Sequence, residues 1–126
     1  LPALETGLLA PQTHAARGSL FPQPWITTGK RAQRMDAVMG NGWRCVLAPS
    51  LTLTGGVATP PWLRTVALGG RDAQEVDGVA EAWFQRHQCV AALVRPDNYI
   101  YGVADSAEAT ATLIEELSTR LGRVGA

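Results

Sequence analysis

Four consecutive residues, Arg95-Pro96-Asp97-Asn98, stand between two apolar runs in the last third of this chain. An arginine and an aspartate beside a proline could hold a carboxylate or a phosphate, because a guanidinium offers paired donors to such groups. The same residues could instead reverse the chain, since proline fixes φ at a value that a turn needs and Asp or Asn can follow it. We favour the turn, and we expect Arg95 to pair with Asp97 or with a carboxylate of another domain.

The two cysteines, Cys45 and Cys89, are the candidate nucleophilic thiols. They lie far apart in the sequence, whereas a dithiol or metal site would bring them closer together. Each falls inside or at the start of an expected strand. We therefore expect two reduced thiols that pack as small hydrophobic side chains, and no thiol–disulfide exchange.

The two histidines, His14 and His87, have no second histidine or cysteine at metal-ligand spacing, so the sequence predicts no zinc site. His87 lies near the expected C-terminus of a helix, where the helix dipole favours a positive charge. The sequence contains no Gly-x-Gly-x-x-Gly dinucleotide fingerprint, Walker motif or nucleophile elbow. No catalytic, cofactor-binding or metal-binding residue is predicted.

The composition is that of one globular domain of 126 residues, with 46% hydrophobic and 17% charged residues. Eleven basic residues balance 11 acidic ones for a formal net charge of +0, which argues against nucleic-acid and membrane-surface partners. No apolar run is long enough to span a bilayer, and no signal-peptide pattern opens the chain. Together with the reduced cysteines, these features predict a cytoplasmic protein.

Residues 1–30 are expected to form an extended lead-in, and residues 31–126 the folded domain. The chain opens on Leu1-Pro2 without an initiator methionine, from which we expect a piece of a longer protein. Proline recurs through the lead-in and leaves no room for a long helix. The stretch SLFPQPWITT predicts a short edge strand or polyproline-like structure. The next stretch, RAQRMDAVMGNG, places apolar residues on one helical face and predicts a helix that ends at Gly40-Asn41-Gly42.

Two strands and a helix are predicted next. The run Trp43–Pro49 is rich in strand formers and predicts a buried strand, and Leu63–Gly70 predicts a second, short strand that glycines end. Residues 50–62 between them fit a strand or a loop equally well, with room for one more βα unit. An Asp72-x-x-Glu75 capping box then predicts a helix to about Arg86, with an apolar face and Gly78 as its weak point.

The last part of the chain predicts two strands and a helix. The strands CVAALVR and NYIYGVA flank the Pro96 turn and must be antiparallel. A second capping box, Asp105-x-x-Glu108, predicts the start of the last helix, which Gly122 ends. Its apolar face comprises Thr110, Leu113, Ile114, Leu117 and Leu121.

The resulting order of elements predicts an α/β fold, a thioredoxin-like mixed sheet with flanking helices. In that fold a Cys-x-x-Cys pair follows the first core strand, at the N-terminus of a helix. Here residues 49–54 occupy that place and contain no cysteine. His87-Gln88-Cys89 stands where thioredoxin-like proteins have a proline. The expected fold therefore lacks the Cys-x-x-Cys motif.

Two tryptophans are candidates for docking against a partner domain, because Trp25 and Trp62 flank proline-rich segments. Packing within the chain itself is the alternative for both. Trp43, Trp83 and Phe84 are expected in the core instead.

Three segments of the chain resemble the C-terminal domain of FAD-dependent aromatic hydroxylases, of the 3-(3-hydroxyphenyl)propionate hydroxylase and phenol hydroxylase type. The segments are GLLAPQTHAARGSLFPQPWI, MDAVMGNGWRCVL and ALVRPDNYIYGVADSAEATATLIEEL. The matching positions, in chain order, are Gly18, Leu20, Pro22, Gln23, Asp36, Gly40, Trp43, Val94, Arg95, Pro96 and Asp97. The order and spacing of these short matches carry the resemblance, and residues 50–62 match least well.

This resemblance implies a thioredoxin-like domain without redox cysteines, attached to a larger N-terminal flavin-binding part. That part would bind FAD, take hydride from NADH or NADPH, and use oxygen to hydroxylate a phenolic ring. The present chain would serve domain packing or homo-oligomerisation, with Trp25, Trp62 and Arg95 as interdomain or interface contacts. One alternative is a stand-alone thioredoxin-like module that binds a small ligand or a protein without redox activity. Another, less favoured, is a thiol oxidoreductase that uses Cys45 and Cys89.

Overall fold

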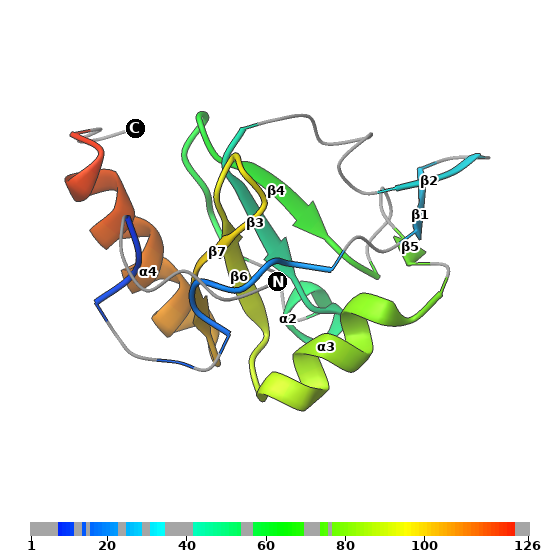
Figure 1. Cartoon of the computed structure of the whole chain (residues 1–126). Helices are drawn as coiled ribbons and strands as arrows, with labels where there is room; N and C mark the ends of the chain where they lie inside the picture. Colours follow the sequence, from blue (N-terminus) through cyan, green and yellow to red (C-terminus); the bar gives the residue numbers. More distant parts are fainter. Residues whose placement is uncertain are drawn as a thin grey trace.

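The computed structural model describes residues 8–11, 14, 16–22, 25–28, 31–34, 42–53, 57–69, 74–75 and 77–122 (Figure 1). The elements, in chain order, are β1 (Trp25–Thr28), β2 (Arg31–Arg34), β3 (Arg44–Leu47), α2 (Pro49–Leu53), β4 (Arg64–Ala67), β5 (Gln74–Glu75), α3 (Val79–His87), β6 (Ala91–Val94), β7 (Ile100–Ala104) and α4 (Ala107–Arg120). Among these helices, none is long and apolar enough to cross a membrane.

A four-stranded mixed sheet with the order β4-β3-β6-β7 forms the centre of the structure. Strand β3 is parallel to β4 and antiparallel to β6, and β6 is antiparallel to β7. Helix α2 connects β3 to β4, so part of the ambiguous 50–62 region is helical and supplies the expected βα unit. A βαβ unit followed by a helix, a hairpin and a last helix is the predicted thioredoxin-like arrangement, which is confirmed.

The sheet is buried on both faces, with α3 on one face and α2 and α4 on the other (Figure 1). Side chains alternate along a strand, so successive residues of β3 enter different clusters. Val46 packs in the cluster around Trp83 and Phe84 of α3, here called the α3 cluster. Cys45 and Leu47 pack in the cluster around Leu113 and Leu117 of α4, here called the α4 cluster. This double burial explains why β3 and β6 are continuous apolar runs in the sequence.

The predicted helix from Arg31 onward is wrong for residues 31–34, which form β2. Strand β2 pairs antiparallel with β1, and Thr28 lies opposite Arg31. Cross-strand pairing therefore overrides the helical spacing of the apolar residues, most of which belong to residues 35–41, outside the described part. The strand predicted in WITT is confirmed as β1. It is the central strand of a second sheet with the order β2-β1-β5, so the predicted edge position is wrong.

Helix α3 begins later than its predicted capping box. Glu75 belongs to β5 and pairs with Ile26 in β1, so it cannot act in the first turn of a helix. The N-cap is Gly78, whose φ of 71° lies in the left-handed region that glycine tolerates. Glycine there marks the start of the helix rather than a weak point within it. Trp83 and Phe84 are buried as predicted, whereas Val79 is exposed.

Helix α4 begins one residue later than predicted. Ser106 is the N-cap, and its Oγ accepts a hydrogen bond of 3.0 Å from the backbone N–H of Ala109. Asp105 therefore precedes the cap, and its carboxylate does not serve the helix terminus. The predicted apolar face is buried from Thr110 to Leu117, and Gly122 follows the helix with a φ of 72°.

Residues 8–11 and 16–22 of the lead-in lie along β7, an edge strand of the four-stranded sheet (Figure 1). The N–H of Ala10 donates to the carbonyl of Tyr101 at 2.9 Å, and the N–H of Gly18 donates to the carbonyl of Ile100 at 2.8 Å. Phe21 is 2% exposed and packs among core residues. This part of the lead-in thus covers an edge that would otherwise present unpaired backbone groups. The division of the chain at residue 30 stays a prediction.

Candidate functional site

The β6–β7 hairpin carries polar residues at both of its ends. The turn end comprises Arg95 to Asn98, which the sequence singles out. The open end comprises His87 to Cys89 before β6 and Asp105 after β7. These two ends have different chemistry.

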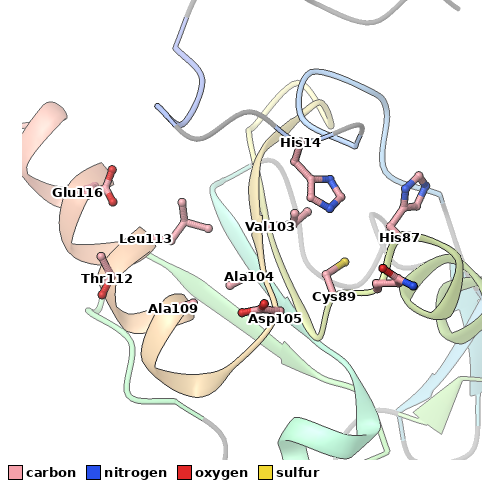
Figure 2. A pocket seen from close by; sticks show the side chains of 11 residues that line it. His14, His87, Cys89, Val103, Ala104, Asp105, Ala109, Thr112, Leu113 and Glu116 are labelled. Atoms are coloured by element: carbon pink, nitrogen blue, oxygen red, sulfur yellow. The ribbon is translucent and has the colours of Figure 1, made fainter.

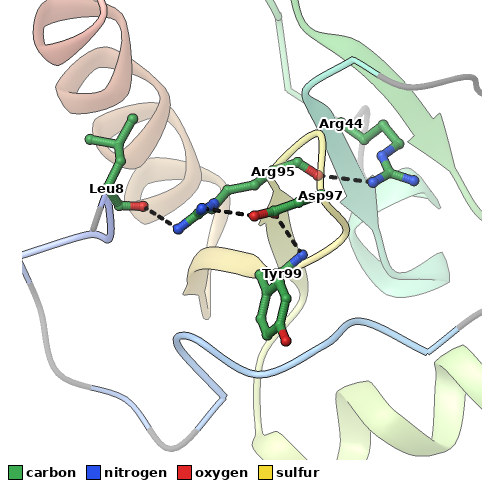
Figure 3. Close-up of polar contacts among 5 residues, drawn as sticks. All are labelled: Leu8, Arg44, Arg95, Asp97 and Tyr99. Atoms are coloured by element: carbon green, nitrogen blue, oxygen red, sulfur yellow. Dashed lines mark hydrogen bonds and ion pairs between the residues drawn. The ribbon is translucent and has the colours of Figure 1, made fainter. Parts of the chain in front are cut away.

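The turn end is held by hydrogen bonds among its own residues (Figure 3). The Arg95 guanidinium forms an ion pair with the Asp97 carboxylate at 2.8 Å, as predicted. The other oxygen of Asp97 accepts from the N–H of Tyr99 at 3.2 Å, and the N–H of Asn98 donates to the carbonyl of Arg95 at 2.9 Å. Asn98 has a φ of 72°, a conformation that asparagine tolerates better than most residues. The turn interpretation is therefore supported.

Arginine side chains also connect the turn end of the hairpin to the rest of the domain by hydrogen bonds (Figure 3). Arg44 is 1% exposed and donates to the carbonyl of Arg95 at 3.0 Å. Arg95 itself extends towards the carbonyl of Leu8, at 3.4 Å. The side chain of Arg95 is thus committed to Asp97 and to the lead-in, which leaves it poorly placed to hold a separate anionic ligand.

Three successive carbonyls of the lead-in accept hydrogen bonds from arginine side chains. Arg95 donates to Leu8, Arg120 to Leu9 and Arg17 to Ala10, the last at 2.6 Å. Arg120 comes from the last turn of α4 and also donates to the Tyr101 hydroxyl at 3.1 Å. Hydrogen bonds from charged donors are stronger than neutral ones. Together they fix the point at which the lead-in meets the hairpin.

The open end faces a cavity of about 470 Å³ (Figure 2). Its walls come from the lead-in, the end of α3, the ends of the hairpin strands and one face of α4. Both histidines of the chain lie here. The lining residues are His14, His87, Gln88, Cys89, Val103, Ala104, Asp105, Ala109, Thr112, Leu113 and Glu116.

The two imidazoles lie close together at one side of this cavity (Figure 2). The ring centroids of His14 and His87 are 6.2 Å apart, and the His87 ring lies 4.7 Å from that of Trp83. Nδ1 of His14 accepts from the N–H of Ala16 at 3.0 Å. Burial, then His14, then Arg86 lower the pKa of His87 from its ordinary 6.5. The lowered pKa runs against the positive charge that a helix C-terminus favours, so the dipole interpretation of His87 gains no support.

The two cysteines are buried thiols that pack among hydrophobic side chains, as predicted, and they belong to the clusters on opposite faces of the sheet. Cys89 lies at the cavity, and burial followed by the charge of Asp105 raises its pKa to about 11. Burial alone raises the pKa of Cys45 to about 12. Both groups are therefore protonated at neutral pH, whereas the thiolate is the reactive form. Neither cysteine is placed or activated for thiol–disulfide exchange.

Sequence reasoning missed this cavity because its residues come from separate segments. His14 lies in the lead-in, Cys89 precedes β6 and Asp105 follows β7, so no local spacing connects them. One available signal was His87-Gln88-Cys89 in place of the thioredoxin-like proline. Within the part of the chain that the structure describes, no three His, Cys, Asp or Glu residues are placed to hold a metal ion.

The three predicted contact residues are only partly placed. Trp25 lies in β1 opposite Arg34, and its side chain is outside the described part. Trp62 is half-buried and packs against the α4 cluster. The register pairs Arg44 with both Arg64 and Val94, so Trp62 and Arg95 lie at the same end of the sheet.

The turn after β3 does not fit a dinucleotide cofactor. Such a cofactor needs backbone N–H groups of a glycine-rich turn at a helix N-terminus. Here the turn is Ala48-Pro49, proline has no N–H, and α2 is only five residues long. Gly69 also packs on this turn, where an added Cβ would lie 2.9 Å from the Cβ of Pro49. No chemical step through FAD is assigned to these residues.

Fold and cysteine chemistry together define a thioredoxin-like domain without a redox-active cysteine pair. Residues 58–120, 63 of the chain's 126, match the family described as the HcaD C-terminal domain. The chain belongs to this family, and the resemblance inferred from its sequence motifs is confirmed.

Comparison with known proteins agrees with this assignment. The chain is 33% identical to a probable NADH-specific resorcinol 4-hydroxylase of Rhodococcus jostii strain RHA1, over 92% of this chain but 23% of that protein. The fold is similar to aklavinone-11 hydroxylase, solved with FAD and aklavinone, with a TM-score of 0.60, 18% identity, and 85% of this chain and 21% of that one covered. It is also similar to the flavin-dependent monooxygenase PieE, solved with FAD and substrate, with a TM-score of 0.68, 17% identity, and 97% and 25% covered.

Proposed function

We propose that this chain is the non-catalytic C-terminal domain of a flavin-dependent aromatic-ring monooxygenase, and that it serves domain packing or oligomerisation. One observation carries the proposal: the alignment takes in 92% of this chain but only 23% of the resorcinol hydroxylase. A larger N-terminal part would then bind FAD and NADH or NADPH and hydroxylate a phenolic substrate with oxygen. The absence of a flavin-binding turn after β3 supports this division of labour. We place the whole protein in the cytoplasm.

The end of the sheet that carries Trp62 and Arg95 is the surface we propose for packing. Trp62 is half-buried within the chain, so part of this residue lies at the surface of that end. Aromatic and arginine side chains are enriched in protein interfaces. Trp25, in the second sheet, is a further proposed contact.

The test uses the longer protein and replaces Trp62 by serine. Because interface tryptophans contribute strongly, we expect a loss of assembly or a lower melting temperature, with turnover per bound flavin unchanged. Val79→Ser is the matched control, since Val79 is 42% exposed on α3 and is not among the proposed contacts. Sedimentation velocity and NADH-dependent product formation measure the two properties. A fall in turnover of the Trp62 variant with normal folding and assembly would contradict a packing role.

One observation favours a second function, a small-ligand module without redox activity. The cavity at the open end of the hairpin, about 470 Å³ in volume, lies within the size range of small-molecule sites. Ligand binding by the isolated chain would support this alternative. The two functions are compatible, because packing uses the opposite end of the sheet.

A further inference from the structure

The cavity at the open end of the hairpin lies away from the packing surface proposed at the turn end. Its apolar wall comprises Val103 and Ala104 from β7 and Leu113 from α4 (Figure 2). The polar residues of the lining, which are His14, His87, Gln88, Asp105, Thr112 and Glu116, surround this apolar wall. A cavity of this kind accommodates a small molecule with an apolar body and one polar group.

Among the residues that the structure describes, the lining of the cavity carries two carboxylates and no lysine or arginine. Asp105 and Glu116 are carboxylates on its lining. Cys89 has a raised pKa and stays a neutral thiol, and the lowered pKa of His87 favours its neutral form. Because the chain has a formal net charge of +0, this negative charge is local rather than general.

Asp105 is the carboxylate best placed to act on a ligand. It is exposed, and Ser106 rather than Asp105 caps α4. No lysine or arginine among the described residues forms an ion pair with it, whereas Asp97 at the other end of the hairpin pairs with Arg95. Its charge is felt at the buried thiol of Cys89, which is 6% exposed at the base of the cavity.

We propose that this cavity binds a small organic cation, an ammonium group on an apolar body. The ammonium lies beside Asp105, with the two imidazoles and the Cys89 thiol around it, and the apolar body packs on Val103 and Leu113. The site lies at the opposite end of the sheet from the proposed packing surface, and the second of the two sources below rests on the proposed N-terminal part. The cation comes from one of two sources with the same chemistry, a free amine or a lysine side chain of the N-terminal part.

The probe is benzylamine, with benzyl alcohol and benzoate as neutral and anionic molecules of the same shape. Both histidines of the chain line the cavity, so every imidazole proton resonance in the NMR spectrum reports on it. We expect saturable shifts of both imidazoles with benzylamine, and binding at least fivefold weaker with the other two. Equal or tighter binding of the alcohol or of benzoate, or no saturable shift with benzylamine, would overturn the proposal.

A pair of charge-neutralising variants locates the ammonium. Asp105→Asn removes the cavity charge with little change of shape, and about fivefold weaker benzylamine binding is expected, as for a partly exposed ion pair. Glu108→Gln removes the same charge from the exposed side of α4, away from the lining, and should bind as the unmodified chain does. Equal affinity in both variants would refute the assigned position.

A benzylamine titration of the longer protein by calorimetry, with Asp105→Asn as its control, distinguishes the two sources. Binding by both the isolated chain and the longer protein indicates a free amine. Binding by the isolated chain alone indicates that a lysine of the N-terminal part fills the cavity. Binding by the longer protein alone would overturn the proposal, because this chain would not contain the site.

Discussion

The two ends of the β6–β7 hairpin place similar side chains in opposite circumstances. At the turn end, Asp97 forms an ion pair with Arg95, and buried Arg44 donates to the backbone of the turn. At the open end, Asp105 faces a cavity beside two histidines and a buried thiol. The end that resembles a binding site in the sequence is satisfied internally. The end that the sequence does not reveal has groups available for a ligand.

This difference shows that residue types alone do not define a site. An arginine beside an aspartate can bind a ligand only when the N–H donors of its guanidinium are free. In this turn the donors of Arg95 are used by Asp97 and by the carbonyl of Leu8. A capping-box carboxylate is structural only when it caps, and Ser106 takes that position in α4. The contrast between the two ends makes several expectations testable.

The largest effect is expected at the contact between the lead-in and the turn end. Phe21 is buried, lies edge-on to Trp83 at 5.0 Å, and donates its N–H to the carbonyl of Asn98. Phe21→Ala should lower the free energy of unfolding by roughly 3–5 kcal/mol, through lost burial and the cavity left behind. Urea denaturation of the chain measures this. A loss below about 1 kcal/mol would mean that the lead-in does not belong to the core.

A smaller effect should separate the two ends themselves. Arg95→Ala removes the ion pair with Asp97 and the contact with Leu8, and we expect a loss of about 1 kcal/mol. Asp105→Asn should leave stability within about 0.5 kcal/mol, because Asp105 is exposed, is not the cap of α4 and forms no ion pair among the described residues. Thermal denaturation of the two variants under the same conditions measures the two losses of stability. Equal losses would remove the distinction between the ends.

The smallest expected effect is on the pH dependence of the free energy of unfolding. It is small because His87 is only half-buried. Its pKa in the folded state lies below the ordinary 6.5, so the unfolded chain binds a proton more readily than the folded one. The associated stability is therefore complete above about pH 6.5 and is lost as the pH falls through the lower, folded pKa. His87→Gln should flatten this part of the stability curve, followed by urea denaturation between pH 7.5 and 5. An unchanged slope in the variant would assign the loss to other groups.

The hairpin and most of the core could be predicted from the sequence, because they rest on local signals. Pro96 with its apolar flanks defines the turn, and the spacing of Leu113, Ile114 and Leu117 defines the buried face of α4. Strand β2 was not predicted although it pairs with β1 across only two residues, because Ala32, Met35 and Val38 recur at a helical spacing. The cavity could not be predicted from any local sequence pattern. It exists only where His14, Cys89 and Asp105 converge from separate elements.

Flavin titration of the isolated 126-residue chain, in parallel with the longer protein, tests the central claim most directly. The claim is that this domain carries no flavin chemistry of its own. We predict that the longer protein binds FAD and oxidises NADH or NADPH in the presence of a phenolic substrate, while the isolated chain folds but does neither. Stoichiometric FAD binding or nicotinamide oxidation by the isolated chain, or a longer protein that binds no flavin, would contradict the assignment.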